Sequence, residues 1–217
     1  MKNDQNEVEK RKIVTCKQNF LKNNFNFYVV ESPEEAKNMV MDKIIPKLNI
    51  KTASWGDSMT VMETGILKEL ENSESIKFIQ TFDKKIPRNL IIERRRKALT
   101  VDLFITGSNA LTEKGQLVNL DGSGNRVAPM IFGPKYVIII AGRNKIVSDI
   151  SEAMDRIRNH AAPLNARRHN YKTPCVFTDK CMDCQHENRI CSYWGIIEKS
   201  KPPGRISIIL INEDLGL

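Results

Sequence analysis

The chain has 217 residues, 41% of them hydrophobic and 28% charged, a balance that is ordinary for a globular protein and allows a sizeable buried core. No apolar run approaches the roughly 20 residues that span a bilayer, and residues 1–12 contain no apolar signal segment, so we expect a cytoplasmic protein that does not associate with membranes. The net charge of +8 is spread along the chain, only 6% of residues are aromatic, and no nucleic-acid-binding motif is present. These features favour a solvated surface, or attraction of anionic metabolites, over nucleic-acid binding as the reason for the charge.

The first third of the chain predicts a polar tail followed by alternating elements. Residues 1–12 are expected to form a disordered tail, and residues 13–25 have apolar positions compatible with an amphipathic helix. A short strand is expected over residues 27–30. Ser32, Pro33 and Glu35 then form a capping box with proline in the first turn, which predicts a helix that Pro46 ends.

A strand, a polar turn and a helix are predicted next, over residues 52–70. The turn contains the candidate ligand-binding residues Gly56, Asp57, Ser58 and Thr60. One interpretation is an anion cradle, because free amides at a helix start attract negative charge. The other is a helix cap with no ligand, since serine and aspartate are common at helix starts in any protein.

The rest of the chain continues the alternation. Strands are expected over residues 76–80, 103–106, 117–120, 136–141 and 205–211, and helices over 87–99, 126–131 and 148–161. The basic run at residues 93–97 is interpreted as a solvated helix face. Strands that alternate with helices predict an α/β fold, with an open, mostly parallel sheet flanked by helices.

Residues 101–145 hold the densest group of polar residues between apolar runs. Ligands bind α/β proteins at loops that leave the carboxyl ends of strands, so we expect a small-molecule site here. Its candidate residues, which oppose the turn at residues 56–60, are Asn109, Glu113, Asn119, Asp121, Asn125 and Arg126. Glu113 could act as a general base or nucleophile, or could simply belong to a hairpin turn. Asn125 and Arg126, at a helix start, favour anion binding.

Four of the five cysteines lie in a loop-rich insertion, at about residues 170–200. They are Cys175, Cys181, Cys184 and Cys191, with the spacing C-x5-C-x2-C-x6-C. Four thiolates this close together could hold zinc or an iron–sulfur cluster, and the C-x2-C pair is a favoured bidentate unit. A redox dithiol or plain buried thiols are the alternatives. The chain contains neither a catalytic-triad pattern nor a dinucleotide-binding glycine motif.

Five segments in combination resemble the lactate-utilisation (LUD) domain family. These segments are residues 55–60, 109–119, 124–127, 132–135 and 142–145, and the resemblance extends from about Ile13 to Leu217, as one α/β domain. It implies the fold of the superfamily of ribose-phosphate isomerases, glucosamine-phosphate deaminases and CoA transferases. Asn109 stands where isomerases of this type have a catalytic aspartate, whereas Glu113 is loosely similar to the glutamate of the CoA transferases.

The resemblance implies three functional hypotheses. LUD-domain proteins encoded beside an iron–sulfur oxidase pair take part in lactate oxidation, so the first is a subunit or accessory factor in lactate or organic-acid utilisation. Such a protein would bind a small anionic metabolite and, as partners, iron–sulfur oxidoreductase subunits. The second hypothesis is a stand-alone isomerase or acyl/CoA transferase. The third is a metal- or redox-active protein centred on the cysteines, since the cysteine-rich segment is a departure from the lactate-oxidising family members.

Overall fold

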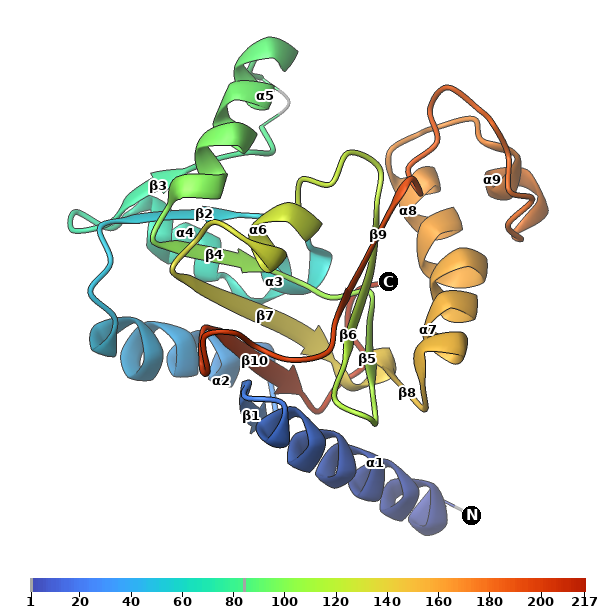
Figure 1. Ribbon diagram of the computed structural model, residues 1–217, viewed down its shortest axis with the longest axis horizontal. Helices are drawn as coiled ribbons and strands as arrows, with labels where there is room; N and C mark the ends of the chain where they lie inside the picture. Colours follow the sequence, from blue (N-terminus) through green and yellow to red (C-terminus); the bar gives the residue numbers. More distant parts are fainter. Residues whose placement is uncertain (1, 84) are drawn as a thin grey trace.

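The computed structural model describes residues 2–83 and 85–217, and its centre is a six-stranded parallel sheet (Figure 1). In spatial order, its strands are β1 (Asn26–Val30), β10 (Ile206–Ile211), β7 (Tyr136–Gly142), β4 (Leu103–Thr106), β2 (Thr52–Trp55) and β3 (Lys77–Ile79). Every neighbouring pair of these strands is parallel. The α/β fold with a parallel sheet is therefore confirmed.

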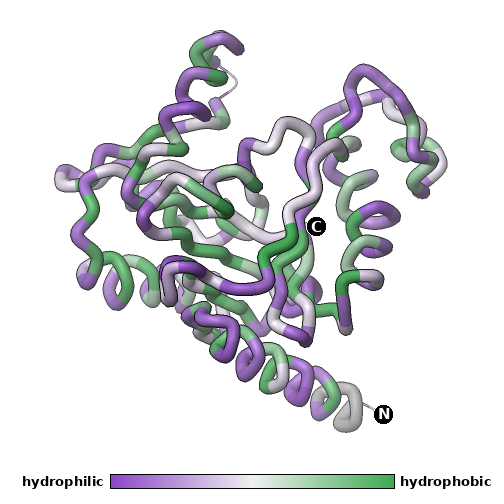
Figure 2. The backbone as a smooth tube through the Cα atoms, in the orientation of Figure 1, coloured by the Kyte–Doolittle hydropathy of each residue, from purple (hydrophilic) through white to green (hydrophobic). Residues whose placement is uncertain are grey.

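Helices cover both faces of this sheet. They are α1 (Lys2–Lys22), α2 (Pro33–Asn38), α3 (Met59–Thr64), α4 (Ile66–Glu71), α5 (Arg88–Lys97), α6 (Val127–Ile131), α7 (Ile150–Arg156), α8 (Ala162–Arg168) and α9 (Pro174–Thr178). The alternation of β10 shows the two-sided burial, because Ile209 packs into the core on the α2 and α3 face while Ile208 packs into the core beneath α1. The central strands are mostly hydrophobic, whereas hydrophilic and hydrophobic residues alternate along α1 (Figure 2).

Local sequence signals account for most helix boundaries. The Ser32 side chain accepts a hydrogen bond from the Glu35 amide at 3.2 Å, which confirms the predicted cap of α2. The helix expected over residues 61–70 is divided at Gly65, whose φ of 75° ends α3 and starts α4. The helix expected to end at residue 161 continues into α8, because the π-helical turn η5 (Ile157–Ala161) precedes Pro163.

A second, four-stranded sheet stands beside the first. It contains β8 (Ile146–Val147), β5 (Ala110–Thr112), β6 (Leu117–Asp121) and β9 (Tyr193–Ile197). β6 is the predicted hairpin strand and pairs antiparallel with β5 and β9. No sequence pattern predicted β8, β9 or α9.

The first helix extends almost to the N-terminus. α1 begins at Lys2, so its backbone includes residues 2–12 of the stretch that was expected to be a tail. No helix in the described part of the chain is long and apolar enough to cross a membrane.

Candidate functional site

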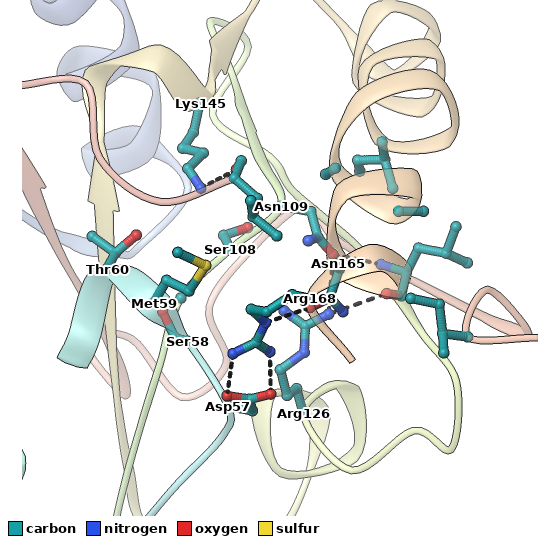
Figure 3. A pocket seen from close by; sticks show the side chains of 17 residues that line it. Asp57, Ser58, Met59, Thr60, Ser108, Asn109, Arg126, Lys145, Asn165 and Arg168 are labelled. Carbon is teal, nitrogen blue, oxygen red and sulfur yellow. Dashed lines mark hydrogen bonds and ion pairs between the residues drawn. The ribbon is translucent and has the colours of Figure 1, made fainter. Parts of the chain in front are cut away.

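A small pocket lies at the carboxyl ends of the central strands, where the predicted polar turns meet (Figure 3). It has a volume of about 60 Å³, which is room for a few water molecules or one small anion. The loops after β2, β4 and β7 form one side and α8 the other. The polar residues that line it are Asp57, Ser58, Thr60, Ser108, Asn109, Arg126, Lys145, Asn165 and Arg168.

Two glycines allow the loops to approach one another. A side-chain carbon on Gly107 would lie 2.5 Å from the Ser58 hydroxyl, and one on Gly56 would lie 2.8 Å from the Arg126 side chain. Larger residues at either position would push these groups out of place. Ser58 also caps α3 by accepting a hydrogen bond from the Val61 amide at 3.3 Å. The prediction that this turn caps a helix is therefore confirmed. Because Ser58 also lines the pocket, the prediction that the turn binds an anion stays a prediction.

Lys145 is a cation buried inside the pocket. It belongs to the turn η4 (Arg143–Lys145) directly after β7, its exposed fraction is 5%, and its ammonium donates to the carbonyl oxygen of Leu217. Burial, followed by the charges of Arg156 and Arg126, lowers the pKa of Lys145 to about 7, against the opposing effect of Glu63. A lysine in this state gains from an anion beside it, because the anion would stabilise the protonated amine.

Arg126 lies on the floor of the pocket in a fixed position. It is paired with the buried Asp121 at 2.5 Å and donates to Asn109 Oδ1 at 3.1 Å. The Asp121 carboxylate also accepts from the backbone amides of Arg126 and Val127, at 2.8 and 2.9 Å. The amides at the start of α6 are thus occupied internally, and the side chain of Arg126 is what faces the pocket.

Asp57 joins the β2 loop to α8. Both of its carboxylate oxygens accept hydrogen bonds from Arg168 (Figure 3). In addition, His169 Nε2 lies 3.3 Å from Asp57 Oδ2. Burial raises the pKa of Asp57, but the hydrogen bonds from His169 and Arg168 outweigh it and lower the pKa to about 2. Asp57 is therefore an ionised structural partner of Arg168, and its charge is compensated.

Asn109 and Asn119 fix the loop after β4. The Asn109 amide donates to Asn119 Oδ1, while Asn109 Oδ1 accepts from the Leu120 amide, both at 3.0 Å. Arg156 Nη1 donates to the Asn109 carbonyl at 2.9 Å and its Nε to the Asn144 carbonyl at 3.2 Å. This arginine holds the two loops that carry Asn109 and Lys145.

The pocket brings together most of the residues that were predicted for a site. Asp57, Ser58, Thr60, Asn109 and Arg126 line it, Gly56 lies directly behind Arg126, and Asn119 supports it from beneath. Asn125 faces a larger neighbouring cleft. Glu113 lies in the turn between β5 and β6, where its carbonyl accepts from Asn19 of α1, and it is not among the lining residues of the pocket.

The sequence interpretation missed five residues that line the pocket or support it: Lys145, Arg168, Arg156, Ser108 and Asn165. Lys145 carries a usable signal, since it follows the central strand β7 by three residues, and parallel strands place such positions at the ligand edge. Arg168 carries none, because its partner Asp57 is 111 residues away in the sequence.

None of the four cysteines of the cysteine-rich segment lines this pocket, although Ile190, next to Cys191, does. Cys175, Cys181, Cys184 and Cys191 are free and half-buried, and Cys16 is buried in the core. Arg158 donates to the Cys181 sulfur at 3.5 Å, and burial together with Cys181 and Cys184 raises the pKa of Cys191, which Arg189 opposes. Among the side chains that the structure describes, no three His, Cys, Asp or Glu residues are arranged to hold a metal ion.

Comparisons with known proteins agree with the fold and establish the family. No curated protein matches the chain. The chain is similar in structure to a DUF162 family protein from Deinococcus radiodurans, with a TM-score of 0.53 and 10% sequence identity, over 94% of this chain and 98% of that one. At this identity the likeness concerns the fold alone. The family model described as the LUD domain matches residues 14–211, and the chain therefore belongs to the LUD domain family.

Proposed function

We propose that this LUD-domain protein binds a small organic anion of the 2-hydroxy or 2-oxo carboxylate type and serves as a subunit or accessory factor in lactate or organic-acid utilisation. The observation that carries the proposal is the buried ammonium of Lys145 in a pocket of about 60 Å³, with the guanidinium of Arg126 on its floor. A carboxylate would give Lys145 the anionic partner that burial demands.

The polar groups around Lys145 favour a hydroxy or oxo acid over a simple anion. Lys145 has three donors, and one of them is used by Leu217, so two are available to a ligand. Ser58 and Thr60 also line the pocket and supply hydroxyl groups. These groups suit a carboxylate with one neighbouring oxygen, such as lactate or pyruvate.

Family membership supports the partners and the compartment that we propose. LUD-domain proteins that accompany an iron–sulfur oxidase pair suggest iron–sulfur oxidoreductase subunits as partners for this chain. The five free cysteines fit the reducing conditions of the cytoplasm, which we propose as its location.

A thermal-shift series with lactate, pyruvate and the neutral amide lactamide tests the anion pocket. At about a hundredfold excess over Kd, a ligand of the native state adds about 2.7 kcal/mol, which for a chain of this size raises Tm by roughly 5–10 °C. We expect this increase with lactate or pyruvate and none with lactamide, which lacks the charge. An equal increase with lactamide, or no increase with either acid, would contradict the proposal.

A second candidate function is a metal site, zinc or an iron–sulfur cluster, formed by Cys175, Cys181, Cys184 and Cys191. It is favoured by the nearness of Cys181 and Cys184 to Cys191, and by Arg189, whose charge opposes the burial that raises the pKa of Cys191 and so favours its thiolate.

Metal analysis and visible absorbance of the anaerobically purified protein test this candidate. We expect stoichiometric zinc or an iron–sulfur spectrum, lost in Cys181→Ser, because that cysteine belongs to the bidentate C-x2-C unit. Cys16→Ala, a buried thiol outside the segment, is the control and should keep the metal. A colourless protein without zinc, or one that keeps its metal in Cys181→Ser, sinks the candidate.

A further inference from the structure

A larger cleft opens directly beside the small pocket. Its volume is about 1020 Å³, and it shares Asp57, Leu120, Arg126, Asn165 and Ile190 with the pocket. α5 forms one wall, the end of α8 with residues 187–190 forms the other, and the loop between β6 and α6 forms the floor. This size suits a ligand as large as a nucleotide cofactor, whereas the small pocket does not.

The α5 wall carries uncompensated positive charge. Arg88, Arg95 and Arg96 line the cleft, and their spacing of seven and eight residues places them on one face of the helix. Arg96 is paired with the exposed Glu93, whereas Arg88 and Arg95 form no ion pair within the described part of the chain. Two unpaired guanidinium groups on one wall favour an anionic ligand.

Arg95 is held ready for such a ligand. Its guanidinium carbon lies 4.4 Å from the centre of the Phe82 ring, a cation–π arrangement that orients it. Its Nε is buried and has no hydrogen-bond partner among the described residues. An unsatisfied buried donor is costly, so a movement of the Arg95 side chain toward a phosphate in the cleft would lower the free energy.

The acidic residues of the cleft neutralise this positive wall only in part. Burial lowers the pKa of Arg95, and the charges of Asp57 and Asp121 raise it. These two carboxylates are paired with Arg168 and Arg126, however, and compensate the wall only in part. Glu187 is an exposed residue on the opposite wall. The α5 wall therefore presents a net positive surface to the cleft.

The opposite wall carries two aromatic rings. His169 and Tyr171 stack with their ring centroids 5.7 Å apart and an interplanar angle of 25°. Tyr171 is 36% exposed, so its ring is accessible. Stacked, accessible rings are a surface on which a planar base packs.

We propose that this cleft is a nucleotide site, with the phosphates on Arg88 and Arg95 and the base against Tyr171 and His169. The combination of a cationic wall and a ring platform across one cleft selects a ligand with both a polyanionic and a planar aromatic part. The site lies beside the small-anion pocket and does not depend on it for binding.

Calorimetric titration with the diphosphates ADP, GDP, CDP and UDP, with inorganic pyrophosphate and with the matching free nucleosides tests this assignment. We expect at least one diphosphate to bind, and to bind more tightly than either pyrophosphate or its own nucleoside. Arg95→Met keeps the apolar stem against Phe82 but removes the charge, and should weaken that nucleotide at least about tenfold, the loss expected for one charged hydrogen bond. Tyr171→Ala should weaken the nucleotide and nucleoside but leave pyrophosphate unchanged.

Lys97→Met is the matched control, because it removes one charge from an exposed position of α5 that does not line the cleft. The affinity of Lys97→Met for the nucleoside diphosphate should stay within about twofold of that of the wild type, since exposed charges contribute little to binding. Failure of all four diphosphates to bind, or binding that neither Arg95→Met nor Tyr171→Ala weakens, would overturn the inference. Pyruvate titrated in parallel keeps the two proposals apart, because its binding without any nucleotide binding overturns the cleft assignment alone.

Discussion

Replacing Lys145 by methionine should weaken pyruvate binding by at least about a hundredfold at pH 6, because breaking a buried ion pair with a carboxylate costs about 3 kcal/mol. In the wild-type protein the affinity should fall as the pH rises through about 7, the pKa of Lys145, since only the protonated amine attracts the anion. The variant should lose this pH dependence. Titration calorimetry between pH 6 and pH 9 measures both effects.

The groups that face Lys145 determine how this profile is interpreted. Guanidinium groups stay charged between pH 6 and pH 9, and burial lowers the pKa of His160, so His160 titrates below Lys145. Lys199→Met, at an exposed position, is the control and should bind pyruvate as the wild type does. Wild-type affinity in Lys145→Met, or a profile that stays flat above pH 7, would refute the role of this lysine.

The same lysine affects stability with the opposite sign. Its folded-state pKa lies below the ordinary value of 10.5, so the stability that comes from the neutral amine is fully present above about pH 10.5 and is lost as the pH falls through about 7. Without a ligand, Lys145→Met should therefore raise the free energy of unfolding below pH 7, by up to about 5 kcal/mol. The difference in the free energy of unfolding between Lys145→Met and the wild type should become smaller as the pH rises from about 7 to about 10.5.

Arg126→Met should be the most destabilising change in the site, at about 3–5 kcal/mol, or a fall of roughly 10 °C in Tm. The Asp121 side chain is only 2% exposed, and the variant would leave its carboxylate buried without a cation. Thermal and urea unfolding measure the loss. The double variant Asp121→Asn/Arg126→Met should recover part of it, because the neutral amide needs no counter-charge.

Arg96→Met is the matched control for this change. It breaks the ion pair with Glu93, whose two side chains are 70% and 55% exposed, and it should cost less than about 1 kcal/mol. A cost for Arg126→Met as small as that of the control, or a double variant that is less stable than Arg126→Met, would show that this ion pair does not hold the pocket floor.

Local patterns predicted the elements whose stability is decided locally. The capping residues of α2 and the apolar run of β7 are sufficient to predict those elements, and both are present. β9 was missed because its pattern is mixed, with Tyr193 and Ile196 exposed and Gly195 buried between them. Its partner β6 lies about 75 residues earlier, and such a pairing leaves no local trace.

The candidate site, like the fold, could be predicted only where local sequence and strand order determine the position of a residue. Strand order places the loops that carry Asp57, Asn109 and Arg126 at one edge, so sequence alone could bring them together. Burial of Lys145 could not be inferred, because lysine is almost always exposed. The pairing of Asp57 with Arg168 depends on where α8 packs, which follows from tertiary contacts and not from spacing.

A crystal structure of the protein with pyruvate tests the central claim most directly, because it shows where the anion binds. We predict the carboxylate in the small pocket, within hydrogen-bond distance of Lys145 Nζ and facing Arg126, at about 2.7–3.2 Å from the donor. Pyruvate bound elsewhere on the molecule, with Lys145 contacting only Leu217, would contradict the account.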